Sequence, residues 1–377
     1  MRFISRMVLT IVLISAVFAA GCLSDSIDND FDTDIPSNGI FVATTDWLAA
    51  GMTAVIHGDP PTKVDLPATQ ISTDPVARYY NERVYVINRM GFDNIQVLNP
   101  YHDYVTEKQY STGNGSNPQD IAFASGKKAF ISRYGNSALR IVKPRSGSKL
   151  GSVELAAYAD ADGLPEPAKM LVVGDRLFVA LQRLDSAAWY VPTDKSTIAV
   201  INTTDNSVVA TVDLATTNPV TDLLYDDVAS KVYVGCAGEW KFNDVTADGG
   251  VESISVDFLT DTYTADGVVI DEATLGGDIG SMVMVADDQF YAIVSDASFT
   301  NYLIRFDPTN PGAGVTVVWT TFSYIPAIAV NANEYIFVAD TDFVEPGVRV
   351  WDSTTDTEIT TEPIDVGMPP VALTVLK

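Results

Sequence analysis

The stretch ERVYVINR, residues 82–89, joins a charged turn to an apolar and aromatic strand, and five close variants of it recur along the chain. They are KKAFISRY (127–134), DRLFVALQ (175–182), SKVYVGCA (230–237), DQFYAIVS (288–295) and EYIFVADT (334–341). A looser version, GIFVATTD, begins at residue 39. Self-similarity of this kind indicates a repeat architecture, in which each unit buries its apolar face against the next.

The aromatic residue of each phrase sets the period of the repeat. These residues are Phe41, Tyr85, Phe130, Phe178, Tyr233, Tyr291 and Phe337, at spacings of 44, 45, 48, 55, 58 and 46. A period in the forties built from short β-rich units is typical of β-propellers with four-stranded blades. Because no segment longer than a turn or two has helical periodicity, the sequence predicts an all-β fold.

The unit around KKAFISRY shows the sequence pattern of one blade. Its four apolar segments are QDIAFAS (119–125), KAFISRY (128–134), SALRIVKP (137–144) and KLGSVELA (149–156). Gly, Asn, Pro and Ser lie between them, and these residues favour tight turns. The recurring phrase is therefore predicted to be the second strand of every blade.

The two ends of the repeat region supply one blade between them. The segment at 39–46 has no apolar strand before it, whereas PPVALTVLK (369–377) reads as a first strand with nothing after it. We expect residues 369–377 to pair beside Phe41 and to close a ring of seven blades. A closed ring also removes exposed strand edges, which would otherwise promote aggregation.

The first 21 residues have the features of an export signal. Two arginines precede an apolar run at residues 7–20, which is shorter than the roughly 20 residues of a membrane span. The run ends in AAGC (19–22) and resembles a bacterial lipoprotein signal. The resemblance implies lipidation of Cys22, palmitate included, and a membrane anchor; Leu23 in place of Asp favours the outer membrane. An ordinary secretory signal and an uncleaved anchor are the alternatives.

Acidic residues dominate the rest of the chain. The 49 Asp and Glu outnumber the 23 Lys and Arg, and the net charge of −26 becomes −28 once residues 1–21, with two Arg and no acid, are removed. This charge disfavours nucleic acid as a partner, because phosphate binding needs basic surface. Residues 22–38 hold five Asp and few apolar residues and are expected to form a flexible tether. That leaves 39–377 as the propeller.

The stretches 196–226, STIAVINTTDNSVVATVDLATTNPVTDLLYD, and 128–156, KAFISRYGNSALRIVKPRSGSKLGSVELA, resemble the YVTN-repeat propellers of bacterial and archaeal surface proteins. The resemblance covers residues 39–377, most clearly in the third and fourth units. The literal tetrapeptide is absent from the second strands. The resemblance to this family implies an exported interaction or scaffold domain, often without catalysis.

Large aromatic residues gather in the loops between second and third strands. LDSAAWYVPTDKS (184–196) carries Trp189 and Tyr190, and AGEWKFNDVTADGG (237–250) carries Trp240 and Phe242. The shorter loops carry Trp47, Phe92, Tyr134, Phe299 and Phe343. Such residues suit contact with proteins or sugars. The alternative is that they fold back and cap the core of the ring.

Charged residues mark two further candidate sites. Arg89, Arg133 and Arg183 follow successive second strands, where they could bind a carboxylate or phosphate or pair with acids such as Asp120 or Glu166. The loop DADGLPEPAK (160–169) holds Asp160, Asp162 and Glu166, oxygen ligands of the kind that calcium prefers. A plain acidic turn is the alternative to a calcium site.

Signals for catalysis are weak. The chain has only two histidines, His57 and His102, and lacks a G-x-S-x-G nucleophile motif. It lacks the C-x-x-C-H motif of covalent haem, and its second cysteine, Cys236, lies in an apolar strand where it is expected to be buried. The sequence therefore predicts a binding or scaffold propeller that recognises an envelope protein or polysaccharide, with no certain cofactor. The alternative is a lactonase-like hydrolase with carboxylates and a divalent metal at the channel mouth.

Overall fold

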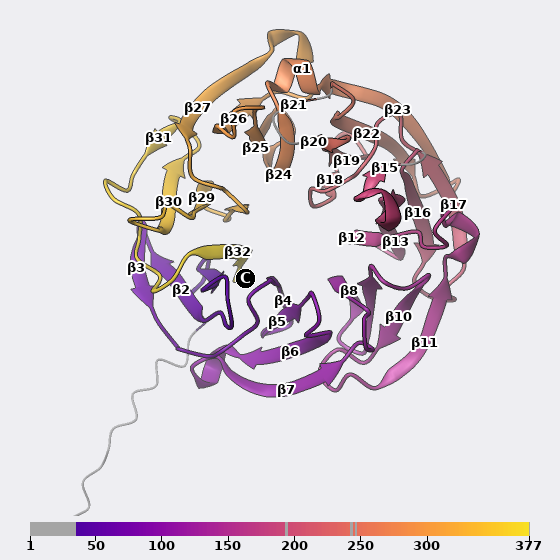
Figure 1. Cartoon of the computed structure of the whole chain (residues 1–377), viewed down its shortest axis with the longest axis horizontal. Coiled ribbons are helices and arrows are strands. Elements are labelled where there is room, and N and C mark those ends of the chain that lie inside the picture. The colour runs from indigo at the N-terminus through magenta and orange to yellow at the C-terminus, as the bar shows by residue number, and fades with distance from the viewer. Residues whose placement is uncertain (1–34, 193–194, 242–243, 246, 377) are drawn as a thin grey trace, which may run out of the picture.

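The computed structural model describes residues 35–192, 195–241, 244–245 and 247–376. In this part of the chain, seven four-stranded antiparallel sheets stand around a central channel (Figure 1). Blade 1 consists of β32 (Pro370–Val375), β1 (Ile40–Thr44), β2 (Thr53–Gly58) and β3 (Pro61–Asp65), and blade 2 consists of β4 (Pro75–Tyr80), β5 (Arg83–Asn88), β6 (Asn94–Asn99) and β7 (Val105–Ser111). Blade 3 consists of β8 (Pro118–Ser125), β9 (Lys128–Arg133), β10 (Ala138–Val142) and β11 (Lys149–Glu154), and blade 4 consists of β12 (Pro167–Val173), β13 (Arg176–Leu181), β16 (Thr197–Asn202) and β17 (Val208–Asp213). Blade 5 consists of β18 (Leu224–Asp226), β19 (Lys231–Cys236), β22 (Gly250–Asp257) and β23 (Thr262–Asp271). Blade 6 consists of β24 (Asp278–Ala286), β25 (Gln289–Ser295), β26 (Asn301–Phe306) and β27 (Val315–Thr321). Blade 7 consists of β28 (Ile328–Val330), β29 (Tyr335–Asp340), β30 (Gly347–Asp352) and β31 (Thr357–Glu358). The seven-bladed all-β propeller predicted from the repeat is confirmed.

The recurring phrase forms the second strand of each blade, as its position in the repeat predicts. These strands are β1, β5, β9, β13, β19, β25 and β29. The aromatic side chain that sets the period is buried in every blade. It packs between sheets: Phe130 of blade 3, for example, lies in one cluster with Leu177 and Val179 of blade 4. The period is thus the distance along the chain between equivalent core positions.

The ring closes where the sequence places the closure. Strand β32 pairs antiparallel with β1, with Phe41 opposite Thr374, and the Leu376 backbone N–H donates to the Gly39 carbonyl at 2.8 Å. Blade 1 then packs on both neighbours: Ile40 lies in a cluster with Phe337 of blade 7, and Phe41 lies in a cluster with Val84 of blade 2. The first blade is therefore assembled from both ends of the described chain (Figure 1).

Two hairpins and one α-helical turn are added to the repeat on the same face of the ring. Two short hairpins, β14 (Leu184–Asp185) with β15 (Val191–Pro192) and β20 (Trp240–Lys241) with β21 (Asp244–Val245), extend the second-to-third loops of blades 4 and 5. A single turn of helix, α1 (Glu272–Leu275), links blades 5 and 6. Among the described residues, no helix has the length and apolar character needed to cross a membrane.

Cys236 is fully buried at the end of β19. Burial raises the pKa of its thiol, which keeps it from ionising and makes it a poor nucleophile. The expectation that Cys236 is a core residue is confirmed.

Candidate functional site

One end of the propeller collects two kinds of connection. Because successive strands are antiparallel, the second-to-third loops and the links between blades emerge on the same face, whereas the first-to-second and third-to-fourth turns emerge on the opposite face. The exposed Trp, Tyr and Phe side chains of the described residues all belong to the first group of connections. They are Trp47, Phe92, Trp189, Tyr190, Trp240, Phe299, Phe322, Tyr324 and Phe343. We call this surface the aromatic face.

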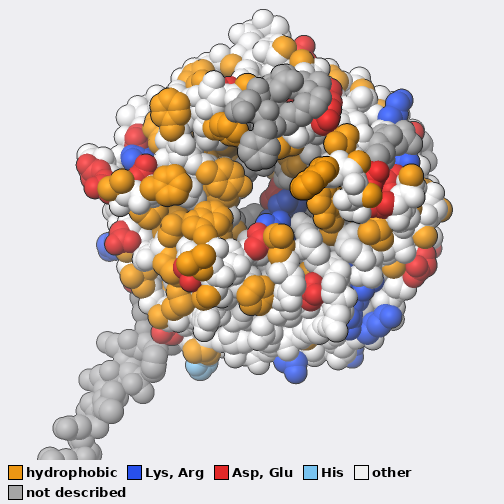
Figure 2. Space-filling view, viewed as in Figure 1, with side chains coloured by type: hydrophobic (Ala, Val, Ile, Leu, Met, Phe, Trp, Pro, Cys, Tyr) orange, Lys and Arg blue, Asp and Glu red, His pale blue; other side chains and the backbone are white. Residues whose placement is uncertain are grey.

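The aromatic face lies around the channel opening. Figure 2 shows hydrophobic side chains beside that opening, densest over the blades that contain β29 and β32. Trp189 is 93% exposed and Phe343 is fully exposed. In the described part of the chain, the large exposed hydrophobic residues elsewhere are all Leu or Val, such as Val228 and Leu259 on the opposite face. Soluble proteins seldom expose large apolar patches that lack a role in binding.

The alternative in which the loop aromatics cap the core of the ring does not hold for these exposed residues. Tyr134 is the exception among the loop residues predicted from the sequence, since it is half-buried with its ring centroid 6.4 Å from that of Tyr190. Phe322 and Tyr324 lie in the link between β27 and β28. The sequence prediction does not include them, because it covers only aromatic residues of second-to-third loops. Phe242 lies outside the described residues.

Several of these aromatics occupy unfavourable backbone conformations. Trp47, Trp189, Tyr190 and Phe299 all have φ near +60°, a region that bulky residues seldom adopt. Each such residue costs about 1–3 kcal/mol and persists only where the surrounding structure imposes the conformation. Glycine or asparagine would fit these four turns at lower cost.

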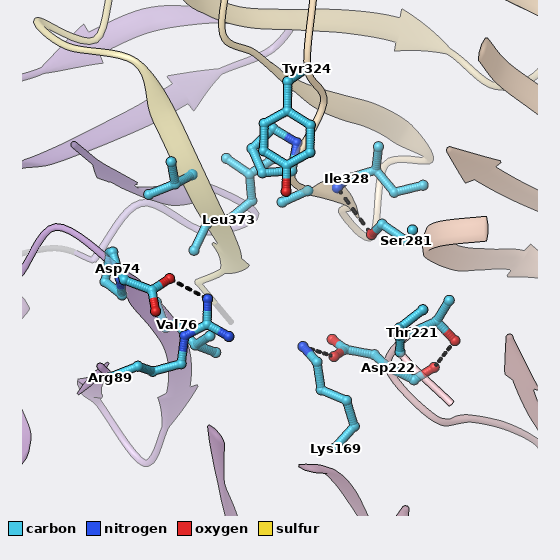
Figure 3. A pocket seen from close by; sticks show the side chains of 18 of the residues that line it. Asp74, Val76, Arg89, Lys169, Thr221, Asp222, Ser281, Tyr324, Ile328 and Leu373 are labelled. Carbon is cyan, nitrogen blue, oxygen red and sulfur yellow. Dashed lines mark hydrogen bonds and ion pairs between the residues drawn. The ribbon is translucent and has the colours of Figure 1, made fainter. Parts of the chain in front are cut away.

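A polar cavity opens at the mouth of the channel. It has a volume of about 260 Å³ and is lined by first strands and inter-blade links of several blades. Figure 3 shows two ion pairs facing each other across it, Asp74 with Arg89 and Lys169 with Asp222. The Lys169 Nζ lies 2.8 Å from Asp222 Oδ1. The Tyr324 hydroxyl points into the space between the two pairs (Figure 3).

Arg78 connects this cavity to the buried interior. Its guanidinium donates to Asp120 at 2.8 and 3.1 Å and to Asp222 at 2.9 Å twice. Asp120 is fully buried and also accepts from the Met170 backbone N–H. Burial opposes ionisation of Asp222, but Arg78 and Lys169 outweigh it and hold the pKa of that carboxyl well below its ordinary value. The network therefore stays charged and joins blades 2, 3, 4 and 5.

The three predicted arginines do not form one cluster. Arg89 lines the cavity and pairs with Asp74 and the Gln119 amide. Arg133 donates to the backbone carbonyl of Ala138. Neither Arg133 nor Arg183 is among the described residues that line the cavity. Their shared position after successive second strands places them on three successive blades.

Of the two acids suggested as partners for these arginines, Glu166 lies close enough to Arg183 for that arginine to oppose the rise of its pKa, whereas Asp120 has a different partner. Arg183 donates to the Lys195 carbonyl at 2.8 Å, and Asp120 binds Arg78 rather than any of the three predicted arginines. The polar cavity is therefore built from charges in or just before first strands together with Arg89 alone of the three predicted arginines.

The predicted acidic cluster does come together. Ligand oxygens of Asp160, Asp162 and Glu166 lie within 4.8 Å of one another. Glu166 is buried and accepts from the Leu184 backbone N–H at 3.2 Å. Burial, followed by the nearby Asp162, raises the pKa of Glu166 to about 8. These oxygens could hold a divalent cation, and they also tie the blade 3–4 link to the Trp189 loop, because Asp162 accepts from Ser186.

A second pair of buried acids has no counterpart in the sequence prediction. Glu272 in α1 accepts from the backbone N–H groups of Asp248 and Gly249, at the base of the Trp240 loop. Its other oxygen and Asp278 Oδ1 are both buried without a hydrogen-bond partner. Burial, then Glu272, raises the pKa of Asp278 to about 8. One proton shared between the two carboxyls would satisfy both oxygens.

These raised pKa values predict that stability falls with rising pH. The pKa of Asp278 has its ordinary value of 3.8 in the unfolded chain but rises to about 8 in the folded protein, so the folded state holds an extra proton in that window. For each such proton, the free energy of unfolding falls by about 1.4 kcal/mol for every unit by which the pH rises. Glu166 contributes in the same way from 4.5 to about 8.

The variant Asp278→Asn tests this assignment. Its amide replaces the shared proton as a donor to Glu272, so we expect near-normal stability at pH 8. Between pH 5 and 8, which lies within the window in which both acids contribute, we expect about half the slope of the parent. Urea unfolding at each pH gives both values. An unchanged slope would show that Asp278 is ionised in the folded state.

Comparison with solved structures shows the same fold at low sequence identity. A protein provisionally named 6-phosphogluconolactonase from Bacteroides fragilis aligns over 90% of this chain and 98% of its own, with 14% identity and a TM-score of 0.62. The periplasmic gluconolactonase of Pseudomonas aeruginosa aligns over 90% and 99%, with 12% identity and a TM-score of 0.61. A Lactobacillus plantarum protein aligns over 90% and 99%, with 11% identity and a TM-score of 0.65.

Similarities at this level of identity establish the propeller fold alone. Neither a scan against models of protein families nor a search of curated proteins finds a match. The resemblance to YVTN-repeat propellers therefore stays a prediction from the sequence.

Proposed function

We propose that this protein is a binding propeller that holds a protein or polysaccharide of the cell envelope on its aromatic face. The observation that carries the proposal is asymmetry: every exposed aromatic side chain in the described residues lies on one face. Exposed Trp and Tyr dominate the energetics of binding surfaces.

Paired variants on the two faces test this function. We expect Trp189→Ala combined with Phe343→Ala to reduce capture of an envelope fraction on immobilised protein by more than tenfold, since hot-spot residues contribute about 2 kcal/mol or more each. The thermal midpoint should stay within about 1 °C or 2 °C, because exposed substitutions change stability by about 0.5 kcal/mol or less.

The opposite face supplies a matched control. Val228→Ala with Leu259→Ala also removes two exposed hydrophobic side chains, one of them 99% exposed, and should leave capture unchanged. Equal loss of capture in both double variants would mean that binding is non-specific and would refute the proposal.

The location at the envelope rests on the sequence of the export signal. Lipidation of Cys22, which lies outside the described residues, would hold the propeller at the outer membrane through several acyl chains. Mass spectrometry of the mature protein should find a lipidated N-terminal cysteine, and Cys22→Ser should move the protein to the soluble fraction. Retention of Cys22→Ser in the membrane would exclude this anchor.

We also propose that Asp160, Asp162 and Glu166 bind calcium. Saturating calcium at about 100 times its Kd would stabilise the protein by about 2.7 kcal/mol. The rise in thermal midpoint should be larger at pH 9 than at pH 6, because calcium must displace the proton of Glu166, whose pKa is about 8. Asp162→Asn is the control. An equal midpoint with and without calcium would identify the cluster as an acidic turn.

A lactonase-like hydrolase is the second candidate, favoured by the charged cavity at the channel mouth. Yet Asp74 and Asp222 are each held by cations, and the lowered pKa of Asp222 makes it a weak general base. Neither His57 nor His102 lines the cavity among the described residues. Turnover in a screen of lactones and esters, abolished by Asp222→Asn, would establish the hydrolase; inactivity of the folded protein would exclude it.

A further inference from the structure

The channel-mouth cavity has a distinctive distribution of charge. Arg89 and Lys169 stand on opposite walls, and each is accompanied by a carboxylate, Asp74 or Asp222 (Figure 3). Arg78 also lines the cavity, with its charge balanced by a fully buried carboxylate. A lone anion entering here would meet two carboxylates, and a lone cation would meet three basic groups. Hydroxyl groups suit both, because they donate to carboxylates and accept from ammonium and guanidinium groups. The wall therefore favours a neutral polyhydroxylated ligand.

Hydrogen-bonding capacity remains in this wall. The Lys169 ammonium has three N–H donors and contacts Asp222 at 2.8 Å. The Arg89 Nε is buried and has no hydrogen-bond partner among the residues that the structure describes. The Tyr324 hydroxyl points into the cavity (Figure 3). A ligand with several adjacent hydroxyls can engage these groups without breaking either ion pair.

The mouth of the cavity is aromatic. Trp47 and Tyr324 both line the cavity and both belong to the aromatic face, with 53% and 57% of their surface exposed. An aromatic ring offers a flat apolar surface for the C–H face of a pyranose ring. The aromatic rings at the mouth suit the C–H face of a sugar, and the donors and acceptors below them suit its hydroxyl groups. A free amino acid would use only the charged groups.

We propose that the channel-mouth cavity receives one sugar residue of a polysaccharide whose neighbouring residues lie on the aromatic face. The volume of about 260 Å³ is below the roughly 300–1,000 Å³ of sites for drug-sized molecules, which limits the cavity to a unit of about one ring. This assignment rests on the proposed function and chooses polysaccharide over protein as its partner.

The test uses the mature full-length protein and defined sugars. Saturation-transfer NMR and calorimetry are run with neutral hexoses, N-acetylhexosamines, hexuronic acids and their short oligosaccharides, and with free amino acids as the competing class. We expect a neutral or N-acetylated oligosaccharide to bind more tightly than its monosaccharide. Binding only by amino acids, or only by sugars that carry a carboxylate, would overturn the assignment.

Variants locate the sugar. Lys169→Met and Tyr324→Ala should each weaken binding at least tenfold, and Asp222 in Lys169→Met keeps its partner Arg78, so the protein should stay folded. Val228→Ala with Leu259→Ala, on the opposite face, should bind as the parent does. Sugar binding that is unaffected by both cavity variants would place the site elsewhere and overturn the assignment.

The two proposals can fail separately. If the Trp189 and Phe343 double variant loses capture of an envelope protein while no sugar binds, the sugar assignment is wrong and the binding face stands. If sugars bind in the cavity but that double variant captures the envelope fraction normally, the cavity stands and the role of the aromatic face is wrong.

Discussion

A chain that ends at Pro369 is expected not to fold. It lacks β32, so the backbone groups of β1 that pair with β32 are left open, and the clusters around Ile40 and Phe41 lose Leu373, Ala372 and Leu376. An open edge beside an exposed core promotes association between chains. We predict that the truncated protein shows no cooperative thermal transition and elutes as aggregates in size-exclusion chromatography.

A permuted chain provides the matched control. Because Val375 lies opposite Ile40 and the Leu376 N–H bonds to the Gly39 carbonyl, residues 370–376 can be placed before Gly39 and joined to it by a short turn. This chain restores the same strand as a local hairpin and should fold with a thermal midpoint close to that of the parent. Folding of the truncated chain without the added strand would contradict the role of β32 in closing the ring.

Replacing Arg78 by methionine is expected to cause the largest loss of stability from a single substitution at the channel. The change leaves Asp120 fully buried without its cation, and an unpaired buried charge costs about 3–5 kcal/mol. Asp222 keeps Lys169, so the loss is assigned chiefly to Asp120. Urea unfolding at pH 7 measures it.

Two further variants separate charge from packing at Arg78. Adding Asp120→Asn to Arg78→Met removes the stranded charge and should recover about half of the lost free energy. Arg305→Met breaks a more exposed pair with Asp356 and should cost about 1 kcal/mol or less. If Arg78→Met and Arg305→Met cost the same, the channel network does not stabilise the ring.

The fold was predictable because its signals are local. Each second strand combines an aromatic core residue with flanking turn residues, and this pattern recurs every 44 to 58 residues. Closure of the ring followed from counting strands at the two ends. The sequence also places the aromatic residues in second-to-third loops, because the position of a loop depends only on which strands flank that loop.

The cavity was not predictable because its contacts are long-range. Arg78 meets Asp222 across 144 positions, and no pattern in one sequence ties the two together. A weaker signal was present: Arg78, Lys169 and Asp222 are charged residues within or beside apolar first strands, which face the channel. The pairing of Glu272 with Asp278 was likewise hidden, because it depends on how α1 sits against the start of β24.

Hydroxyl-radical footprinting of the protein, free and bound to the envelope partner it captures, tests the central claim most directly. The claim is that binding uses the aromatic face, so oxidation of Trp189, Phe343 and Trp47 should fall severalfold in the complex while oxidation of Leu259 and Val228 stays unchanged. Protection of Leu259 and Val228 with no change at the three aromatic residues would contradict it.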